Sequence, residues 1–404
     1  MLAKLAWRNI WRNKRRSLIV LAAIVVGMVV LVFSESFIAG SLKGMLDNQI
    51  GSHTSHIQIH RKGFSDNKII QSTIPNASFV EGVLQGTPGV LRHSKRVVTY
   101  ALISSASNSS GVSLVGVDPA QEQQVSKIQA SVVQGSYLSG KDHEIILGKN
   151  LAERLGVALG DKVVAMASML DGHVGSDVFR IVGLFETFSS DFDRLYVFIP
   201  TGNAQRMLGL GDQISEFAVL AQTMELVPQL DVMLERELGG SYEVLSYREL
   251  LPAIMAILDV ADEAMGIYYL IIGAATIFGI VNAMLMSVFE RIREFGVLMA
   301  MGMKNGKLFS MIVLEASYLG VLGMLIGMGV GLAIYLPFWK YGLDLSAFSE
   351  GLTMVGMSAV VYPILTVGAV IRMAVIIPLV AVVAALYPAT KAIRLQPVRA
   401  IYYV

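Results

Sequence analysis

Three histidines, His53, His56 and His60, lie close together in the sequence and are of a type that could ligate a metal ion. Imidazole is a frequent ligand of zinc and related metals. In a strand, however, side chains alternate between the two faces and each residue advances the chain by about 3.3 Å. His56 and His60 would then lie about 13 Å apart on one face, with His53 on the other. We therefore expect no metal site here.

Asp191 and Asp193, followed by Arg194, form a second group that could do chemistry, because paired carboxylates can act as general acid and base. They come directly after Ser189 and Ser190, a combination typical of a solvated turn. The sequence contains no cysteine, which excludes thiolate nucleophiles, cysteine zinc sites and disulfides. Because no convincing pair of nucleophile and base exists, we expect this chain not to be an enzyme.

The segment Gly302-Met-Lys-Asn-Gly-Lys307 is the nearest approach to a phosphate-binding loop. It lacks the G-x-x-x-x-G-K-[S/T] spacing with which backbone amides surround phosphates. An ATP-driven activity would therefore need another chain, with ATP and magnesium held there, and we expect this chain to bind no cofactor.

Glu35, Glu315 and Arg372 are charged residues within or beside long apolar runs. Ionisable residues inside a membrane indicate a function by default, for example a proton relay. Water can reach a residue at the end of a span, so a solvated position is the simpler interpretation for the two acids. Arg372 is expected to extend its side chain to the membrane interface.

The composition indicates a membrane protein. Of the 404 residues, 54% are hydrophobic and 16% charged, and the net charge is +1. A typical soluble chain is about 25% charged. High hydrophobicity excludes disorder, and the lack of a basic excess argues against nucleic-acid binding.

The apolar residues are concentrated in runs at 18–33, 265–289, 308–338 and 371–389. Crossing a bilayer takes about 20 apolar residues. The first run could also be a signal peptide, but no small-residue cleavage site follows, so we expect a retained anchor. The predicted organisation is an interfacial helix at 1–16, spans at 17–40, 265–289, 307–337 and 369–390, a large domain at 41–264, a short helix at 290–306, an outer loop at 338–368 and a tail at 391–404.

Basic residues near the span ends predict the orientation of the chain. Residues 1–16, the segment at 290–306 and the tail are rich in Lys and Arg, whereas the 338–368 loop is not. The positive-inside rule places both termini in the cytoplasm and the 41–264 domain outside. Trp7 and Trp11, at i and i+4 among Arg and Lys, predict an amphipathic helix at the cytoplasmic interface.

The 41–264 domain shows short β-like runs and helix-like stretches without a regular βαβ rhythm, which predicts an α+β domain. Its last stretch, 247–260, is predicted as one continuous helical stalk leading to the second span. In the third span, small residues recur at helical steps, which favours close helix packing, with a hinge as the alternative. These residues are Gly320, Gly323, Gly327 and Gly331.

Several stretches together resemble the FtsX/MacB-like ABC transporter permeases. The segment Glu290-Arg-Ile-Arg-Glu-Phe-Gly-Val-Leu-Met-Ala-Met-Gly-Met303 is similar to that family's E-R-x-R-E-x-G-x-L-x-A-x-G motif. The end of the chain, 387–400, resembles the family's closing Y-P-A-x-x-A motif, and the start, 6–16, resembles its opening helix. Residues 115–119 and 146–161 resemble its periplasmic core.

The resemblance implies an α-helical membrane protein with four spans and a large α+β periplasmic domain between helices 1 and 2. It also implies a bacterial inner-membrane location, pairing with a second permease copy or paralogue, and service by a cytoplasmic ATPase dimer. In such mechanotransmission, ATP hydrolysis below moves the periplasmic domains above. By the resemblance, the helix at 290–306 seats on the ATPase through Glu290, Arg291, Arg293, Glu294, Phe295, Gly296, Val297, Leu298 and Met301.

The resemblance is strongest to the LolC/LolE lipoprotein-releasing branch, which implies extraction of lipoproteins, with a periplasmic chaperone or adaptor as partner. Acyl chains would then enter a lipid-exposed cavity lined by Val29, Val32, Phe33, Ile267 and Leu270. Two other functions stay open: efflux of drugs or peptides through an outer-membrane tunnel, and FtsX-like regulation of a periplasmic hydrolase.

Overall fold

The computed structural model describes residues 2–12, 14–67, 70–74, 76–348, 351–352 and 356–394. The chain divides into two units. The helical unit comprises Met1–Leu42, Ile257–Asp344 and Val360–Val404, and the α+β unit comprises Lys43–Ala256 and Leu345–Ala359. The predicted tail at 391–404 lies largely outside the described residues, as does the end of the 387–400 motif.

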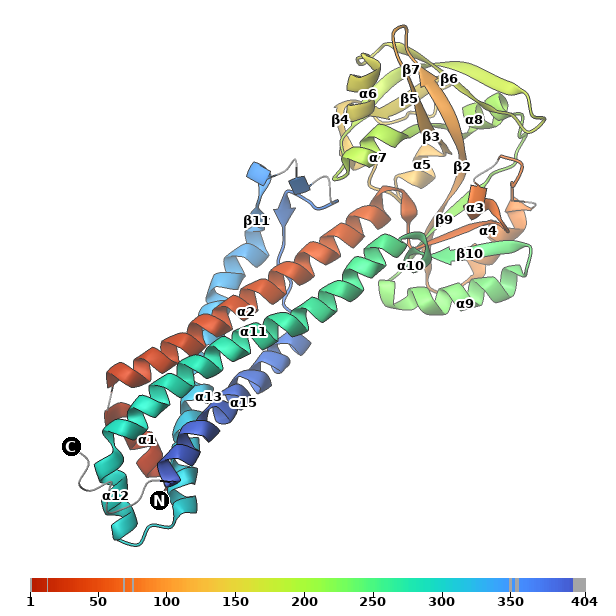
Figure 1. Cartoon of the computed structure of the whole chain (residues 1–404). Coiled ribbons are helices and arrows are strands. Elements are labelled where there is room, and N and C mark those ends of the chain that lie inside the picture. The colour runs from red at the N-terminus through yellow and green to blue at the C-terminus, as the bar shows by residue number, and fades with distance from the viewer. Residues whose placement is uncertain are drawn as a thin grey trace. The chain divides into compact units, whose positions relative to one another are not determined.

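Four helices are long and apolar enough to cross a membrane: α2 (Lys14–Gln49), α11 (Pro252–Glu290), α13 (Asn305–Tyr341) and α15 (Val367–Ile393). Within the helical unit they run side by side and share one buried apolar cluster (Figure 1). Each exceeds the roughly 20 residues that a bilayer requires. The expected α-helical membrane protein with an inserted α+β domain is therefore confirmed.

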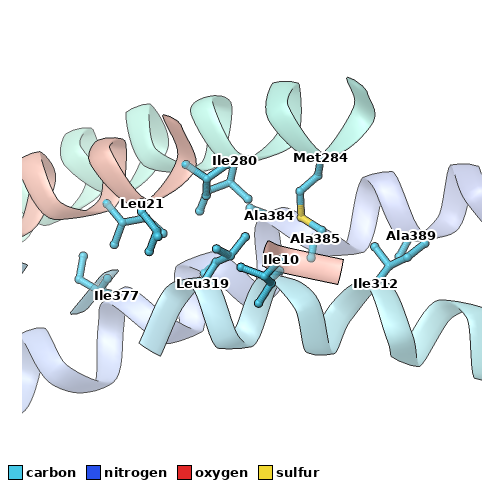
Figure 2. Close-up of a cluster of buried hydrophobic side chains, with 14 of the residues drawn as sticks. Ile10, Leu21, Ile280, Met284, Ile312, Leu319, Ile377, Ala384, Ala385 and Ala389 are labelled. Atoms are coloured by element: carbon cyan, nitrogen blue, oxygen red, sulfur yellow. The ribbon is translucent and has the colours of Figure 1, made fainter. Parts of the chain in front are cut away.

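Two short helices lie at the end of this unit that the sequence predicts to face the cytoplasm. α1 (Leu2–Arg12) ends before Lys14, where α2 begins, and the Ser17 hydroxyl donates to the Ile10 carbonyl at 2.6 Å across this break. α12 (Ile292–Ala300) follows α11 directly. Ile10 is fully buried and points into the cluster together with side chains of the long helices (Figure 2). α1 is thus anchored to the bundle through its apolar face.

Gly320, Gly323 and Gly327 of α13 lie where a side chain would collide with a neighbouring helix. A Cβ on Gly323 would lie 2.6 Å from Ile24 Cγ2, and one on Gly327 would lie 2.6 Å from Met28 Cβ. Real Cβ atoms do not approach so closely, and small residues are what allow helices this near each other. A Cβ on Gly320 would lie 2.6 Å from Ala381 Cβ of α15, and one on Gly331 would lie 3.1 Å from Val32 Cβ of α2, which is a tight contact.

The α+β unit is built on a mixed sheet with the order β10-β1-β9-β2-β3-β8-β5-β7-β4, in which β6 also pairs with β2 and β7. The β3–β8 and β5–β7 pairs are parallel and the others antiparallel. The strands are β1 (Ile57–Arg61), β2 (Val90–Ser104), β3 (Ser109–Val117), β4 (Val132–Gly135), β5 (Glu144–Gly148), β6 (Lys162–Ser168), β7 (Val174–Phe185), β8 (Tyr196–Pro200), β9 (Glu216–Ala221) and β10 (Tyr242–Ser246).

Short helices connect these strands. They are α3 (Phe64–Asn67), α4 (Ala77–Gly86), α5 (Pro119–Glu122), α6 (Lys149–Leu155), α7 (Ser190–Leu195), α8 (Thr201–Leu208), α9 (Val227–Leu238) and α10 (Tyr247–Leu250). At the β5–α6 junction, a Cβ on Gly148 would lie 2.5 Å from the Cα of Asp193. Only glycine lets α7 approach this junction so closely.

The predicted continuous stalk at 247–260 is wrong in one respect. α10 ends at Leu250, Leu251 adopts a non-helical conformation (φ −121°, ψ 54°), and α11 begins at Pro252. Proline disfavours a helical conformation at the residue before it and is well tolerated in the first turn of a new helix. The link to α11 is therefore broken at Leu251.

Candidate functional site

The surface of α12 is split between side chains that face the bundle and side chains that face outward. Phe295 and Gly296 are buried, and Phe295 belongs to the apolar cluster of the helical unit. Arg293 and Val297 are exposed, and 72% of Met301 is exposed. Leu298 is half-buried and Glu290 is exposed. The segment thus presents outward only part of the set that the sequence indicated.

Charged residues on this segment are used within the protomer. Glu294 pairs with Arg12 of α1, whose Nη2 lies 2.8 Å from Oε1 and 2.6 Å from Oε2. Arg291 places Nε 3.2 Å from Glu294 and Nη1 3.3 Å from Glu315 of α13. Its guanidinium also lies 4.9 Å from the centre of the Phe295 ring. These ion pairs connect α1, α12 and α13.

The electrostatics of Glu294 follow from this geometry. Burial opposes its ionisation, but hydrogen bonds from Arg12 and Arg291 outweigh burial and hold the pKa of Glu294 below its usual value. Glu294 is therefore charged at neutral pH and holds two arginines. Phe295 and Gly296 are buried, and Arg291 and Glu294 form ion pairs within the protomer, although 48% of the Glu294 side chain is exposed. The contact of these four residues with an ATPase stays a prediction.

A groove of about 490 Å³ lies between α1, α12 and α13. Its floor is apolar, with Leu5, Leu298 and Met311 among its lining residues, and its rim is basic, with Arg8 and Arg293. Trp7 and Trp11 on α1 are partly exposed, and the Trp7 ring meets Tyr318 of α13 edge to face at 5.7 Å.

At the opposite end of the helical unit, Glu35 of α2 is buried and is held by two partners. The Tyr269 hydroxyl of α11 donates a hydrogen bond to Glu35, and Arg372 of α15 pairs with it. Arg372 was expected only to extend to the interface. It instead forms an ion pair with an acid 337 positions away in the sequence.

The expected cargo-lining residues differ in how far they are exposed. Ile267 and Leu270 of α11 are 61% and 71% exposed and face outward from the bundle. Val29 and Phe33 of α2 are half-buried. Val32 packs against Gly331 of α13 and is fully buried. Its side chain therefore does not line an outward-facing surface.

The α+β unit contains a buried ion network that sequence reasoning missed. Arg96 of β2 is fully buried; its Nε and Nη2 donate to Glu122 at 2.9 and 2.7 Å, and its Nη1 donates to Glu216 at 2.8 Å. His60 Nε2 lies 3.2 Å from Glu216, and the His53 carbonyl accepts from Arg96 at 2.5 Å. One indication of this network was present in the sequence: Arg96 is a charged residue at an inward-facing strand position, between Ser94 and Val98.

The contacts of this network account for the positions of His53 and His60 and for the ionisation of Glu216. Burial opposes ionisation of Glu216, but His53, His60 and Arg96 outweigh it and keep the pKa of Glu216 far below its usual range. Within the part of the chain that the structure describes, no cluster of His, Cys, Asp and Glu is arranged to hold a metal. His53 and His60 instead help to hold β1 and the preceding turn against β2 and β9.

The second candidate group is also structural. Asp193 accepts hydrogen bonds from the Thr187 amide at 3.0 Å and from its hydroxyl at 2.7 Å, and Arg194 lies 3.8 Å from Asp191. Asp193 is buried, whereas Asp191 is exposed. Burial raises the pKa of Asp193 to about 6. The two aspartates thus lie in the short helix α7, in different environments.

A helical bundle with four apolar helices and an α+β domain inserted after the first defines a multi-pass membrane protein with a large domain on one side. Residues 17–236 match the MacB-like periplasmic core domain, and residues 266–397 match the FtsX-like permease C-terminal domain. The chain therefore belongs to the family of ABC transporter permeases with a MacB-like periplasmic core domain, as the resemblance indicated.

The chain is also similar to individual proteins. The lipoprotein-releasing system transmembrane protein LolC of Xylella fastidiosa is 26% identical over 301 residues, which are 71% of this chain and 72% of LolC. The pyoverdine export ATP-binding/permease protein PvdT of Pseudomonas aeruginosa is 24% identical over 98% of this chain and 58% of PvdT. The solved periplasmic region of MacB from Actinobacillus actinomycetemcomitans is 15% identical over 52% of this chain and 97% of that region, with a TM-score of 0.36.

Proposed function

We propose that this chain is the permease subunit of a mechanotransmission transporter in which a separate ATPase dimer drives the periplasmic domain, and that its cargo is a lipoprotein of the inner membrane. The observation that carries the proposal is the exposed face of α12 beside a basic-rimmed apolar groove, on a chain of the ABC permease family. Similarity to LolC supports the choice of cargo.

The surface that contacts the ATPase consists, in this proposal, of outward-facing residues of α12 together with the groove rim. Val297 and Met301 supply apolar contact area, and Arg293 and Arg8 supply positive charge. Glu290 lies at the α11–α12 junction and adds a charged position to this surface. Ion pairs of Arg291 and Glu294 connect α12 to α1 and α13, so that in this proposal force on α12 reaches α13.

Substituting the two exposed apolar residues with aspartate tests this surface. Val297→Asp with Met301→Asp should lower co-purification of the ATPase at least about tenfold, which corresponds to about 1.4 kcal/mol. Val232→Asp on α9, which is also exposed, is the matched control and should leave co-purification unchanged. Wild-type recovery of the ATPase with the double variant would refute this contact surface.

For the cargo, the proposed entry face is formed by Ile267 and Leu270 of α11 with the half-buried Val29 and Phe33 of α2. Ile267 and Leu270 are three residues apart, so they share one face of the helix. Apolar side chains in such positions would accept acyl chains. Ile267→Gln with Leu270→Gln should slow lipoprotein release from spheroplasts several-fold, whereas Leu379→Gln on the exposed face of α15 should not. Equal rates in all three proteins would refute this entry face.

Export of a small molecule is the second candidate function, because the similarity to PvdT extends over 98% of this chain. The two candidates differ in what accumulates when the protein is depleted. Loss of lipoprotein release supports extraction, and retention of a small exported molecule with normal lipoprotein release supports export. If neither changes and cell-wall hydrolysis falls, regulation of a hydrolase replaces both.

The proposed orientation has both termini in the cytoplasm and the α+β unit in the periplasm. Glu153→Cys on the exposed side of α6 should react with a membrane-impermeant maleimide in intact cells with a permeable outer membrane. Ala300→Cys on α12 is the paired control and should react only after lysis. Because the natural chain has no cysteine, each variant carries one label site. The reverse labelling pattern would invert the topology.

A further inference from the structure

Helix α1 has three faces with different surroundings. Ala6 and Ile10 are buried in the apolar cluster of the bundle. A second face lines the groove beside α12 through Leu5, Arg8, Asn9 and Arg12. Lys4, Trp7 and Trp11 form the third face, because positions i, i+3 and i+7 lie on one side of a helix. This third face takes no part in the proposed contact with the ATPase.

The two tryptophans of the third face are half-exposed and contact other rings. Trp7 is 43% exposed and Trp11 is 46% exposed. Their rings meet edge to face at 6.1 Å, and Trp7 meets Tyr318 of α13 in the same way at 5.7 Å. We call Trp7, Trp11 and Tyr318 the aromatic shelf. Rings with an apolar body and a polar tip favour the level of the lipid headgroups in a membrane.

The position of the shelf along α13 agrees with that level. Tyr318 and Trp339 are 21 residues apart on one helix, which is about 31 Å at 1.5 Å per residue. The hydrocarbon core of a bilayer is about 30 Å thick. No charged residue lies between the two, and the large side chains exposed along this stretch are apolar: Val321, Leu325, Ile326, Val330, Ile334 and Leu336. Trp339 and the shelf therefore mark opposite sides of the hydrocarbon core.

Two basic residues without an acidic partner lie at the end of the bundle that carries the shelf. Lys4 is exposed on the shelf face of α1, which contains no acidic residue. Arg15 is exposed in the first turn of α2, one turn before Ile19, which is 66% exposed. Arg15 is therefore the polar end of an outward-facing apolar stripe. Among the described residues neither Lys4 nor Arg15 forms an ion pair, whereas Arg12 pairs with Glu294.

We propose that the aromatic shelf, with Lys4 and Arg15, binds the headgroups of anionic phospholipids such as phosphatidylglycerol. Basic residues beside a membrane span attract anionic lipids, and ammonium and guanidinium groups donate hydrogen bonds to phosphate oxygens. A zwitterionic headgroup carries its own cation, which offsets this attraction. The acyl chains lie along the exposed apolar residues of α2 and α13. In the proposed orientation this is the cytoplasmic leaflet, but the binding depends neither on the orientation nor on the cargo.

Tryptophan fluorescence of the full-length chain in vesicles of equal parts phosphatidylglycerol and phosphatidylcholine tests the proposal. The chain has three tryptophans, so Trp339→Phe leaves Trp7 and Trp11 as the reporters. Bromine, which quenches tryptophan, is placed on one lipid or on the other, so both membranes have the same composition. Brominated phosphatidylglycerol should quench at least twofold more than brominated phosphatidylcholine. Bromine near the headgroup end of the acyl chain should quench more than bromine at the chain's end.

Charge variants in the Trp339→Phe protein identify the cause of this quenching difference. Lys4→Gln with Arg15→Gln should abolish the difference, whereas Lys4→Arg with Arg15→Lys, which keeps both charges, should retain it. Lys340→Gln removes a basic residue from the last turn of α13, at the other end of that helix, and is the matched control that should also retain it.

Several results would overturn the proposal. Equal quenching by the two brominated lipids before any charge is removed would do so, as would a quenching difference that survives loss of both charges. Absence of quenching by either lipid would show that a protein covers the shelf. Loss of the quenching difference in millimolar inorganic phosphate would show recognition of a free phosphate rather than a lipid.

Discussion

Arg12 and Glu294 are 282 positions apart in the sequence, yet one guanidinium nitrogen of Arg12 lies within hydrogen-bond distance of both carboxylate oxygens of Glu294. The contact joins the first helix of the chain to the short helix between the second and third spans. Arg291 reaches the same carboxylate and also Glu315 of α13. The N-terminal helix is therefore a structural part of the end of the bundle that carries α12, and not a loose basic flank.

The Arg12–Glu294 contact is half-exposed, so its effect on stability should be small compared with that of the buried residue next to it. Exposed ion pairs contribute about 0.2–1 kcal/mol, whereas truncating a buried phenylalanine costs about 3–5 kcal/mol. Glu294→Gln should thus barely change the thermal stability of the purified protein, and Phe295→Ala should lower it strongly. Similar losses in both variants would contradict the buried position of Phe295.

The glycine stripe of α13 offers a matched pair on one helix. Gly327→Ala places a methyl group against Met28 and should destabilise the bundle by about 1–3 kcal/mol. Among the described residues, nothing lies within 4 Å of a Cβ at Gly329, so Gly329→Ala should be neutral or slightly stabilising. Thermal unfolding monitored by size-exclusion chromatography compares the two, and equal effects would argue for a hinge rather than packing.

Arg96 should be the most sensitive charged residue of the α+β unit. Arg96→Met leaves Glu122 and Glu216 buried without their cation, and breaking a buried ion network in this way costs about 3–5 kcal/mol. Arg92→Met, at an exposed position on the same strand, is the control and should cost little. Urea unfolding of the full-length chain measures both, and a tolerant Arg96→Met would show that the acids find other partners.

Asp193 predicts a pH dependence with a defined sign. Burial raises the pKa of Asp193 from 3.8 to about 6, so the protonated carboxyl is favoured in the folded state. Its contribution to stability is fully present below pH 3.8 and is lost as the pH rises through about 6. Asp193→Asn, which cannot titrate, should remove this decline. Thermal unfolding from pH 4 to pH 7 follows it, and identical pH profiles for the variant and the wild type would contradict the assignment.

Local patterns in the sequence were sufficient for the architecture. The four apolar runs have the length that a bilayer demands, and the steps between Gly320, Gly323, Gly327 and Gly331 follow the helical repeat. The motif at 290–303, taken together with the stretches at 6–16, 115–119, 146–161 and 387–400, indicated the family. The apolar runs and the glycine steps each involve residues within a few turns of one helix. Their spacing in the sequence therefore gives their relative positions directly.

Side-chain direction and partnership depended on how the distant segments pack. Arg372 with Glu35, Arg12 with Glu294, and Arg96 with Glu122 and Glu216 join separate elements, and the sequence contains no spacing rule for such pairs. The apolar residues at 295–301 looked like one face, but Phe295 is buried in the apolar cluster of the helical unit, whereas 72% of Met301 is exposed. An unpaired charge is costly to bury, so these charged residues pair where the bundle and the sheet bury them. In an isolated segment each charge would be hydrated instead.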